Sequence, residues 1–268
     1  MERDGQTDRV IGDPIGEPLE QQLDRLRGPG SRRVFELVEQ SQLHRPIMID
    51  ADEAVTAVRP YAWLLDRVGD DGIKLTGAGR LPPAVVTEAM SVLEDRVDWI
   101  GKANREEHTL PVFELREAGR RCRLVRKNKG TLVLTPTGRA LRGDPVALWW
   151  HLAAALPDAR ADIERDAGTM LLLAVGGGIP LNWDIARKVV TDGLAAAGWQ
   201  ISGTGEPLSE WQAFEAARDT WTILEQLAAL ARPRYGDPPA VPTQAAVTFA
   251  RAALRGSEWS SSTAAARG

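Results

Sequence analysis

Apolar residues recur at helical spacing along most of the chain, and this repeat constrains the fold more than any other feature. Side chains three and four positions apart share one face of a helix, as Tyr61, Leu64, Leu65 and Val68 do here. Such stripes predict helices over residues 61–68, 85–93, 145–156, 163–174, 186–197 and 211–228. Strand-like sequence is confined to the short segments 73–76, 123–126 and 131–135. The sequence therefore predicts a mainly α fold.

Several predicted helices carry end signals. Pro60 is expected to begin the first helix, and Asp144-Pro145 is an N-cap followed by a first-turn proline. Ser209 and Gln212 have the spacing of a capping box. The three glycines at 176–178 follow a helix and lack a Gly-Lys-Ser/Thr continuation, so we interpret them as a helix stop and not as a phosphate-binding loop.

Residues 111–142 combine a helix with a hairpin. A helix that begins at Pro111 is followed by a short strand, a turn at Asn128-Lys129-Gly130 and a return strand over 131–135. Asn and Gly tolerate the left-handed backbone that tight hairpin turns require. A hairpin after a helix indicates a winged helix, in which the hairpin is the wing.

The pattern Leu-Thr-x-x-Gly-Arg occurs twice, at residues 75–80 and 134–139. The second copy resembles the winged helices of bacterial regulators, in which Gly-Leu-Leu-Arg, the wing and Leu-Thr-x-x-Gly-Arg follow one another. Arg123 stands where that pattern has glycine, so the turn before the wing is expected to differ. Because the pattern is repeated, the region 59–143 is predicted to be winged-helix-like, with two degenerate units as one option.

A wider stretch, from residue 61 to about residue 160, resembles an uncharacterised family of high-GC actinobacteria. The likeness lies in LTGAGRLPP at 75–83, GKANREE at 101–107 and Leu110-Pro111-Val112. Members of that family often carry this region behind a plasmid ORF-three-like domain. The resemblance implies a winged-helix-like region without an agreed activity.

The composition and the helical stripes together divide the chain into parts. The predicted organisation is a mobile leader (1–30) with one short helix at 19–26, an N-terminal helix and linker (31–58), the winged-helix-like region (59–143), a helical region (144–255) and a mobile tail (256–268). The leader and the tail lack apolar periodicity and are rich in polar residues, Gly, Pro or Ser.

Basic residues gather at the end of the predicted helix and in the hairpin. Residues 116–129 contain seven Lys and Arg and one Glu, whereas the whole chain has a net charge of −4. In a helix-turn-helix protein this helix enters the major groove of DNA. The predicted nucleic-acid-binding residues are Arg116, Arg120, Arg121, Arg123, Lys127 and Lys129. This interpretation requires exposed side chains at Arg116, Arg120, Arg123 and Lys127, and buried ones at Leu115 and Cys122.

Other kinds of chemistry lack a sequence pattern. The histidines and Cys122 have no partner at metal-ligand spacing, and no catalytic set is present, so neither a metal, a cofactor nor an enzyme is predicted. Glu106-Glu107-His108 is interpreted as a polar turn between helices. A single cysteine excludes an intramolecular disulfide and fits a cytoplasmic location, and Cys122 is predicted to be a buried apolar group. The apolar runs are shorter than the roughly 20 residues that span a bilayer.

Two functional hypotheses follow. The first is a DNA-binding accessory or regulatory protein that contacts double-stranded DNA through the basic cluster. The second is an interaction module in which the same region contacts a protein partner or a second copy of the chain.

Overall fold

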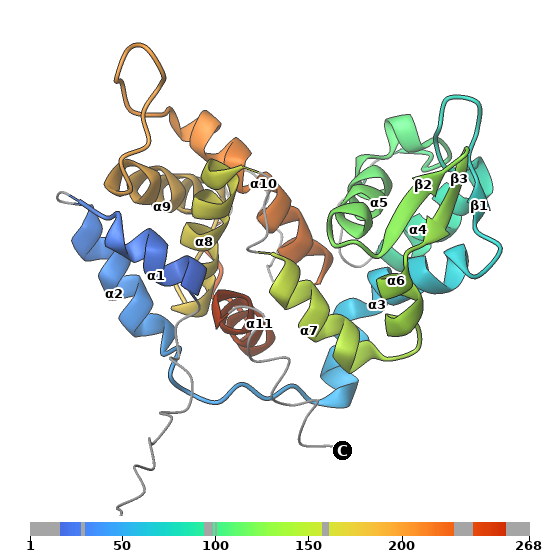
Figure 1. Cartoon of the computed structure of the whole chain (residues 1–268), viewed down its shortest axis with the longest axis horizontal. Helices are drawn as coiled ribbons and strands as arrows, with labels where there is room; N and C mark the ends of the chain where they lie inside the picture. Colours follow the sequence, from blue (N-terminus) through green and yellow to red (C-terminus); the bar gives the residue numbers. More distant parts are fainter. Residues whose placement is uncertain are drawn as a thin grey trace, which may run out of the picture.

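The computed structural model describes residues 17–27, 30–93, 99, 101–156, 161–227 and 238–255. Within these ranges the protein is mainly helical, as predicted, and has one small sheet (Figure 1). Two lobes are visible, one with the sheet and one built only of helices. No helix in the described ranges has the length and apolarity needed to cross a membrane.

The helical lobe is built around α8 (Asp162–Gly176), whose residues from Asp166 to Gly176 are all buried. Four helices pack around it: α2 (Ser31–Ser41), α9 (Trp183–Ala196), α10 (Glu210–Gln226) and α11 (Gln244–Arg255). The capping box of α10 is present, because Gln212 N–H donates to Ser209 Oγ and Ser209 N–H donates to Gln212 Oε1. In the described part of residues 144–255, only isolated β-bridges accompany the helices, as expected.

The first described segment corrects the prediction of a mobile leader. Residues Glu17–Asp24 form α1, close to the predicted helix at 19–26, and Leu19 and Leu26 are buried in the core. Arg25 Nη2 lies 2.8 Å from Oδ1 of the fully buried Asp166. Residues 17–27 therefore pack against the helical lobe, while residues 1–16 and the predicted tail lie outside the described residues.

The other lobe begins with α3 (Ala51–Val68), which starts ten residues before the helix predicted at 61. Asp50 caps it by accepting hydrogen bonds from the backbone N–H groups of Asp52 and Glu53. Pro60 lies inside the helix and does not begin it. The buried stripe runs on through it, with Val58 before the proline and Tyr61 after it. The predicted boundary at residue 59 is therefore wrong.

The remaining elements of this lobe follow in a fixed order. They are β1 (Ile73–Lys74), α4 (Pro83–Leu93), a 3-10 helix (Glu106–His108), α5 (Leu110–Arg121), β2 (Val125–Asn128), β3 (Thr131–Leu134) and α6 (Pro136–Leu141). The three strands form an antiparallel sheet in the order β1-β3-β2, with Ile73 opposite Leu132 and Val125 opposite Leu134. The helix, the hairpin and the absence of a larger sheet in the described ranges agree with the prediction.

The two Leu-Thr-x-x-Gly-Arg segments belong to one unit, because the strand before the first segment pairs with the hairpin before the second. Their local structures differ. Thr135 Oγ1 accepts from Gly138 N–H and caps α6. Thr76 Oγ1 accepts from Arg80 N–H and closes a turn between β1 and α4. The option of two degenerate units is therefore wrong, and the sequence likeness reflects two uses of a threonine hydroxyl.

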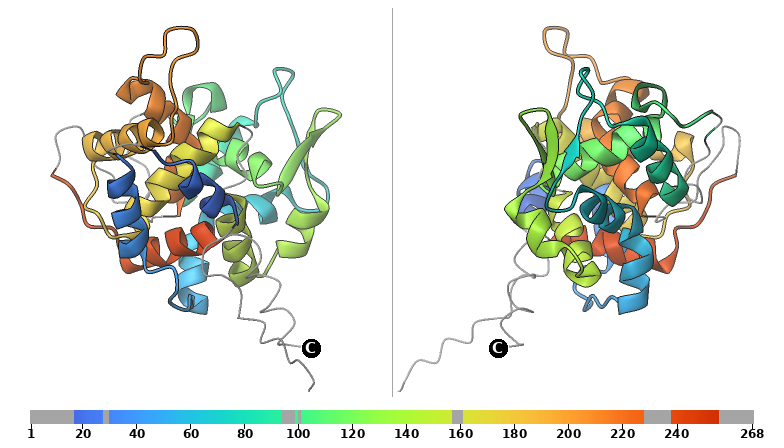
Figure 2. Two further views of the ribbon diagram at one scale, coloured as in Figure 1. Left: turned by 60° about the vertical axis from the view of Figure 1, so that its left-hand side comes forward. Right: turned by 90° about the vertical axis from the view of Figure 1, so that its right-hand side faces the viewer.

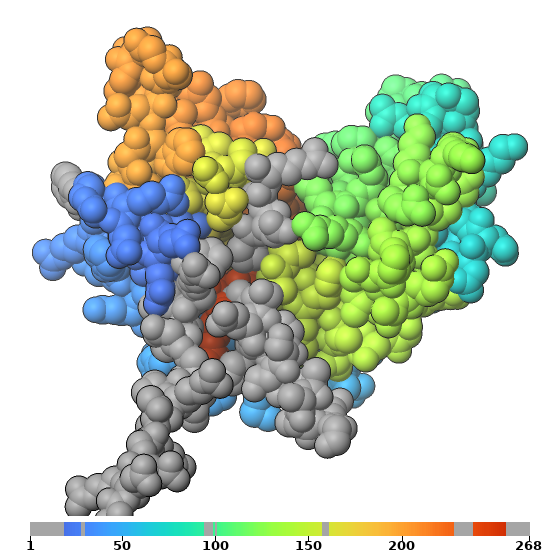
Figure 3. All heavy atoms as spheres, viewed as in Figure 1, coloured from blue at the N-terminus to red at the C-terminus, as the bar shows by residue number. Residues whose placement is uncertain are grey.

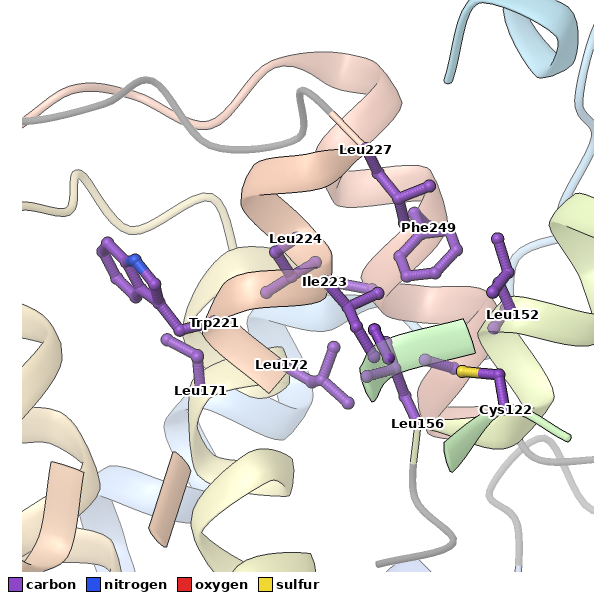
Figure 4. Close-up of a cluster of buried hydrophobic side chains, with 14 of the residues drawn as sticks. Cys122, Leu152, Leu156, Leu171, Leu172, Trp221, Ile223, Leu224, Leu227 and Phe249 are labelled. Atoms are coloured by element: carbon purple, nitrogen blue, oxygen red, sulfur yellow. The ribbon is translucent and has the colours of Figure 1, made fainter. Parts of the chain in front are cut away.

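The lobes share one apolar core. Helix α7 (Pro145–Ala155), capped by Asp144 as predicted, packs against both α3 and α11. Figure 4 shows Cys122, at the end of α5, beside Leu152 and near Ile223 and Phe249 from the helical lobe. Burial raises the pKa of the Cys122 thiol to about 12, so this side chain is an apolar core group, as predicted.

A buried hydrogen bond also joins the two lobes. The hydroxyl of Tyr61 donates to Gln226 Oε1 at 2.6 Å, across the contact between α3 and the end of α10. Burial raises the pKa of this phenol well above its ordinary value. Because a buried polar group is costly without a partner, this bond fixes how the two lobes meet.

Candidate nucleic-acid interface

Helix α5 forms where the sequence predicted it and ends slightly earlier. Pro111 lies in the first turn, where its missing N–H leaves no helical hydrogen bond unmade. Val112, Leu115 and Ala118 form the buried stripe that packs the helix into the lobe. The helix ends at Arg121, and its neighbours are α3, α4, the 3-10 helix and α10.

Arg116 is buried, contrary to the prediction that it lies on an exposed basic face. Only 7% of the residue is exposed, and its Nε lies 2.9 Å from Glu106 Oε1. Its Nη1 donates a hydrogen bond to the carbonyl of Gly79 at 2.9 Å. Arg116 follows Leu115 on the packed side of α5, where a guanidinium needs internal partners because water does not reach it. It is therefore a structural residue.

Glu106, the partner of Arg116, is the buried member of the polar turn that was predicted at 106–108. Its side chain is fully buried, and Oε2 accepts a hydrogen bond from Leu81 N–H at 2.8 Å. Burial raises the pKa of this carboxyl, and the Leu81 N–H and the Arg116 charge oppose that rise. Glu106 and Arg116 together hold the turn at residues 76–80 against the start of α5.

The two arginines at the end of α5 are also engaged. Arg121 Nη2 lies 3.1 Å from Asp219 Oδ1 on α10, which makes it part of the contact between the lobes. Arg120 Nη1 donates to Glu117 Oε2 at 2.7 Å within the helix, and its side chain is 44% exposed. Helix α5 therefore has its basic residues paired with carboxylates, and one side of it faces α10.

The remaining predicted cations, Arg123, Lys127 and Lys129, lie just before the hairpin or in it and are exposed. Together with Arg126, which was not among the predicted site residues and is also exposed, we call them the basic wing. Arg126, Lys127 and Lys129 form no ion pair with any residue that the structure describes. The hairpin and the turn at 76–80 project side by side from the lobe, as Figure 2 shows. In Figure 3 the hairpin lies at the surface, on the side away from the blue N-terminal helices.

The backbone of the hairpin explains how the basic residues come to project. Lys129 and Gly130 have φ of 43° and 80°, the left-handed pair that a tight hairpin turn requires. Arg123 has φ of 55°, so it adopts the conformation for which the resembled pattern has glycine. Thr135 Oγ1 donates a hydrogen bond to the Arg123 carbonyl and ties this turn to the start of α6.

The sequence missed two parts of this surface. Lys74 is exposed on β1 opposite Thr131, beside the tip of the hairpin, although it is far away in the sequence. The turn at 76–80 lies next to Lys127, because a Cβ added to Gly79 would lie 2.9 Å from Lys127 Nζ. The sheet register brings these groups together. Only the likeness of the two Leu-Thr-x-x-Gly-Arg segments pointed to this turn.

Acidic residues at the base of the sheet are neutralised. Arg139 Nε lies 3.2 Å from Asp70 Oδ1, and Arg142 Nε lies 3.0 Å from Asp66 Oδ1. The described residues contain no group of three or more His, Cys, Asp and Glu side chains that could hold a metal ion.

Comparisons with protein-family models, with curated proteins and with solved structures find no match for this chain.

Proposed function

We propose that the lobe from α3 to α6 is a winged helix and that its basic wing binds double-stranded DNA through the phosphate backbone, as part of an accessory or regulatory protein. The order of its elements and the sheet order β1-β3-β2 support the winged-helix interpretation. The observation that carries the function is that Arg126, Lys127 and Lys129 are exposed and form no ion pair with the described residues, in a chain of net charge −4.

The packing of α5 determines which element of the lobe would make most of the contacts with DNA. A recognition helix needs a free face to reach base edges in the major groove. Here Arg116 is buried and Arg121 is bound to α10, which leaves Arg120 as the most exposed cation of that helix. In the hairpin, Arg126, Lys127 and Lys129 form no ion pair with any residue that the structure describes. We therefore expect phosphate contacts to dominate and sequence preference to be weak.

A second candidate is that the wing binds an acidic surface of a protein. The packing of α5 favours this alternative, since a molecule without a free recognition helix has no evident means of reading bases. Salt dependence identifies binding to DNA phosphates. For each phosphate contact, the logarithm of the affinity falls by about 0.9 for every unit increase in the logarithm of the salt concentration.

The test is an electrophoretic shift on random duplex DNA at two salt concentrations. The variant Arg126→Glu/Lys127→Glu reverses two wing charges and should abolish the shift, while the free energy of unfolding changes by less than about 1 kcal/mol because the side chains are exposed. The matched control is Arg32→Glu/Arg33→Glu on α2, which makes the same change in net charge on the other lobe. Loss of binding in both variants, or a wild-type chain that does not bind duplex at low salt, would contradict the proposal.

A further inference from the structure

A hollow of about 350 Å³ lies between the turn at 76–80 and the start of α5. It is near the lower end of the size range of small-molecule pockets, which fits one ring system better than a large ligand. Two aromatic rings, a guanidinium and an exposed leucine contribute to its wall. The lining residues are Arg80, Trp99, Glu106, Glu107, His108, Leu110 and Phe113.

The wall of the hollow is fixed by the buried pair described above. The Phe113 ring lies between two guanidinium groups, with Arg80 Cζ 5.5 Å and Arg116 Cζ 5.8 Å from its centroid. Arg116 is held by Glu106 and by the Gly79 carbonyl. The Arg80 guanidinium forms no hydrogen bond or ion pair with the residues that are described, although its charge helps to lower the pKa of Glu106. It can therefore donate hydrogen bonds to a ligand in the hollow.

The same turn connects the hollow to the basic wing. Lys127 Nζ rests against Gly79, and the next residue, Arg80, lines the hollow. Lys127 has no carboxylate partner among the described residues, so its ammonium can accept a phosphate. Lys127 and the hollow are thus linked through the adjacent residues Gly79 and Arg80.

We propose that the hollow holds one unpaired nucleobase of a DNA strand whose phosphates lie on the basic wing. The inference rests on the proposed function and specifies its substrate as DNA with an unpaired base. Trp99 lines the hollow and supplies a ring for stacking, and Arg80, which lies over the Phe113 ring, donates to acceptors on the edge of the base. A base that is paired and stacked in a duplex cannot enter such a pocket. The bound base must therefore be in a single strand or flipped out of the stack.

The test compares three fluorescent DNA probes by anisotropy at one salt concentration: a full duplex, a duplex with one bulged base and a duplex with a single-stranded overhang. The two probes with unpaired bases should bind roughly ten-fold more tightly than the full duplex. Trp99→Ala should remove this preference and retain duplex binding. Trp211→Ala, which removes a tryptophan that is 68% exposed on α10, is the matched control and should change neither.

A second variant and a second probe guard against misfolding. Phe113→Leu removes the ring over which Arg80 lies and retains an apolar side chain, so Arg80 loses its support and the preference should also be lost. A 2-aminopurine at the bulged position should change its fluorescence on binding to the wild-type chain and not on binding to Trp99→Ala.

Three outcomes would overturn the inference. Equal affinity for paired and unpaired probes overturns it while leaving wing binding intact, whereas no binding of any probe overturns both proposals. Displacement of the 2-aminopurine signal by an equal nucleotide concentration of free thymidine monophosphate would show that a free nucleotide, and not a strand, occupies the hollow.

Discussion

The basic cluster of residues 116–129 divides at Cys122 into two regions with opposite behaviour. Before it, Arg116, Arg120 and Arg121 each meet a carboxylate, those of Glu106, Glu117 and Asp219 respectively. After it, the cations of the basic wing project into solvent. Residues of the same type thus stabilise the fold in the helix, whereas Arg126, Lys127 and Lys129 in the hairpin form no ion pair with the described residues and remain available for a ligand. A count of charges along the chain does not separate these two roles.

Of the variants that test this difference between helix and hairpin, Arg116→Ala is expected to lower the free energy of unfolding most. Removing one member of a buried pair leaves the other charge uncompensated, which costs about 3–5 kcal/mol of unfolding free energy. Urea denaturation at neutral pH measures the loss. Arg33→Ala, at a half-exposed residue of α2, is the control and should lose less than about 1 kcal/mol. A similarly small loss for Arg116→Ala would show that the pair is not buried in solution.

The pH dependence of stability tests the same buried pair, Glu106 and Arg116. The folded-state pKa of Glu106 is raised by burial, so the wild-type chain loses stability as pH rises from the ordinary glutamate pKa through the raised value. Arg116 lowers this pKa, and its removal lets the pKa rise further. The destabilisation by Arg116→Ala should therefore be larger at pH 7 than at pH 4. Denaturation curves at the two pH values test this, and an equal loss at both would exclude Glu106 as the titrating group.

The smallest effect is expected where α5 meets α10. Arg121 and Asp219 form a partly exposed ion pair, with 30% and 51% of the side chains exposed. A double-mutant cycle with Arg121→Ala and Asp219→Ala should give a coupling energy of roughly 0.2–1 kcal/mol. A coupling of several kcal/mol would mean that this contact, and not the shared apolar core, holds the lobes together.

Local chemistry explains which elements could be predicted. Asp144-Pro145 and Ser209 with Gln212 mark their helices because capping depends on neighbours in the sequence. The turn at Asn128-Lys129-Gly130 was also predicted from its residue types, although the residues with positive φ are Lys129 and Gly130 and not Asn128. Pro60 misled the prediction for a related reason: a proline most often begins a helix, yet the packing of Val58 and Tyr61 on either side keeps α3 continuous.

The candidate site was predicted in part. The cations of the hairpin were identified from the sequence because the strand and turn signals place them at an edge. Lys74 was missed because sheet register brings it to the hairpin, and the hollow was missed because its lining residues come from distant segments. The location of Arg116 was predicted incorrectly, since spacing alone did not show that Glu106 would be drawn into the interior to meet it.

The sequence by itself determined the helical class, most helix ends, the hairpin and the concentration of positive charge, all of which depend on residues within a few positions of each other. The tertiary structure decided which charges are paired, how α1 and α5 pack, and which side chains surround the hollow. Burial and ion pairing depend on groups that are distant in the chain, such as Asp166 with Arg25. Their energies arise only when folding removes both partners from water.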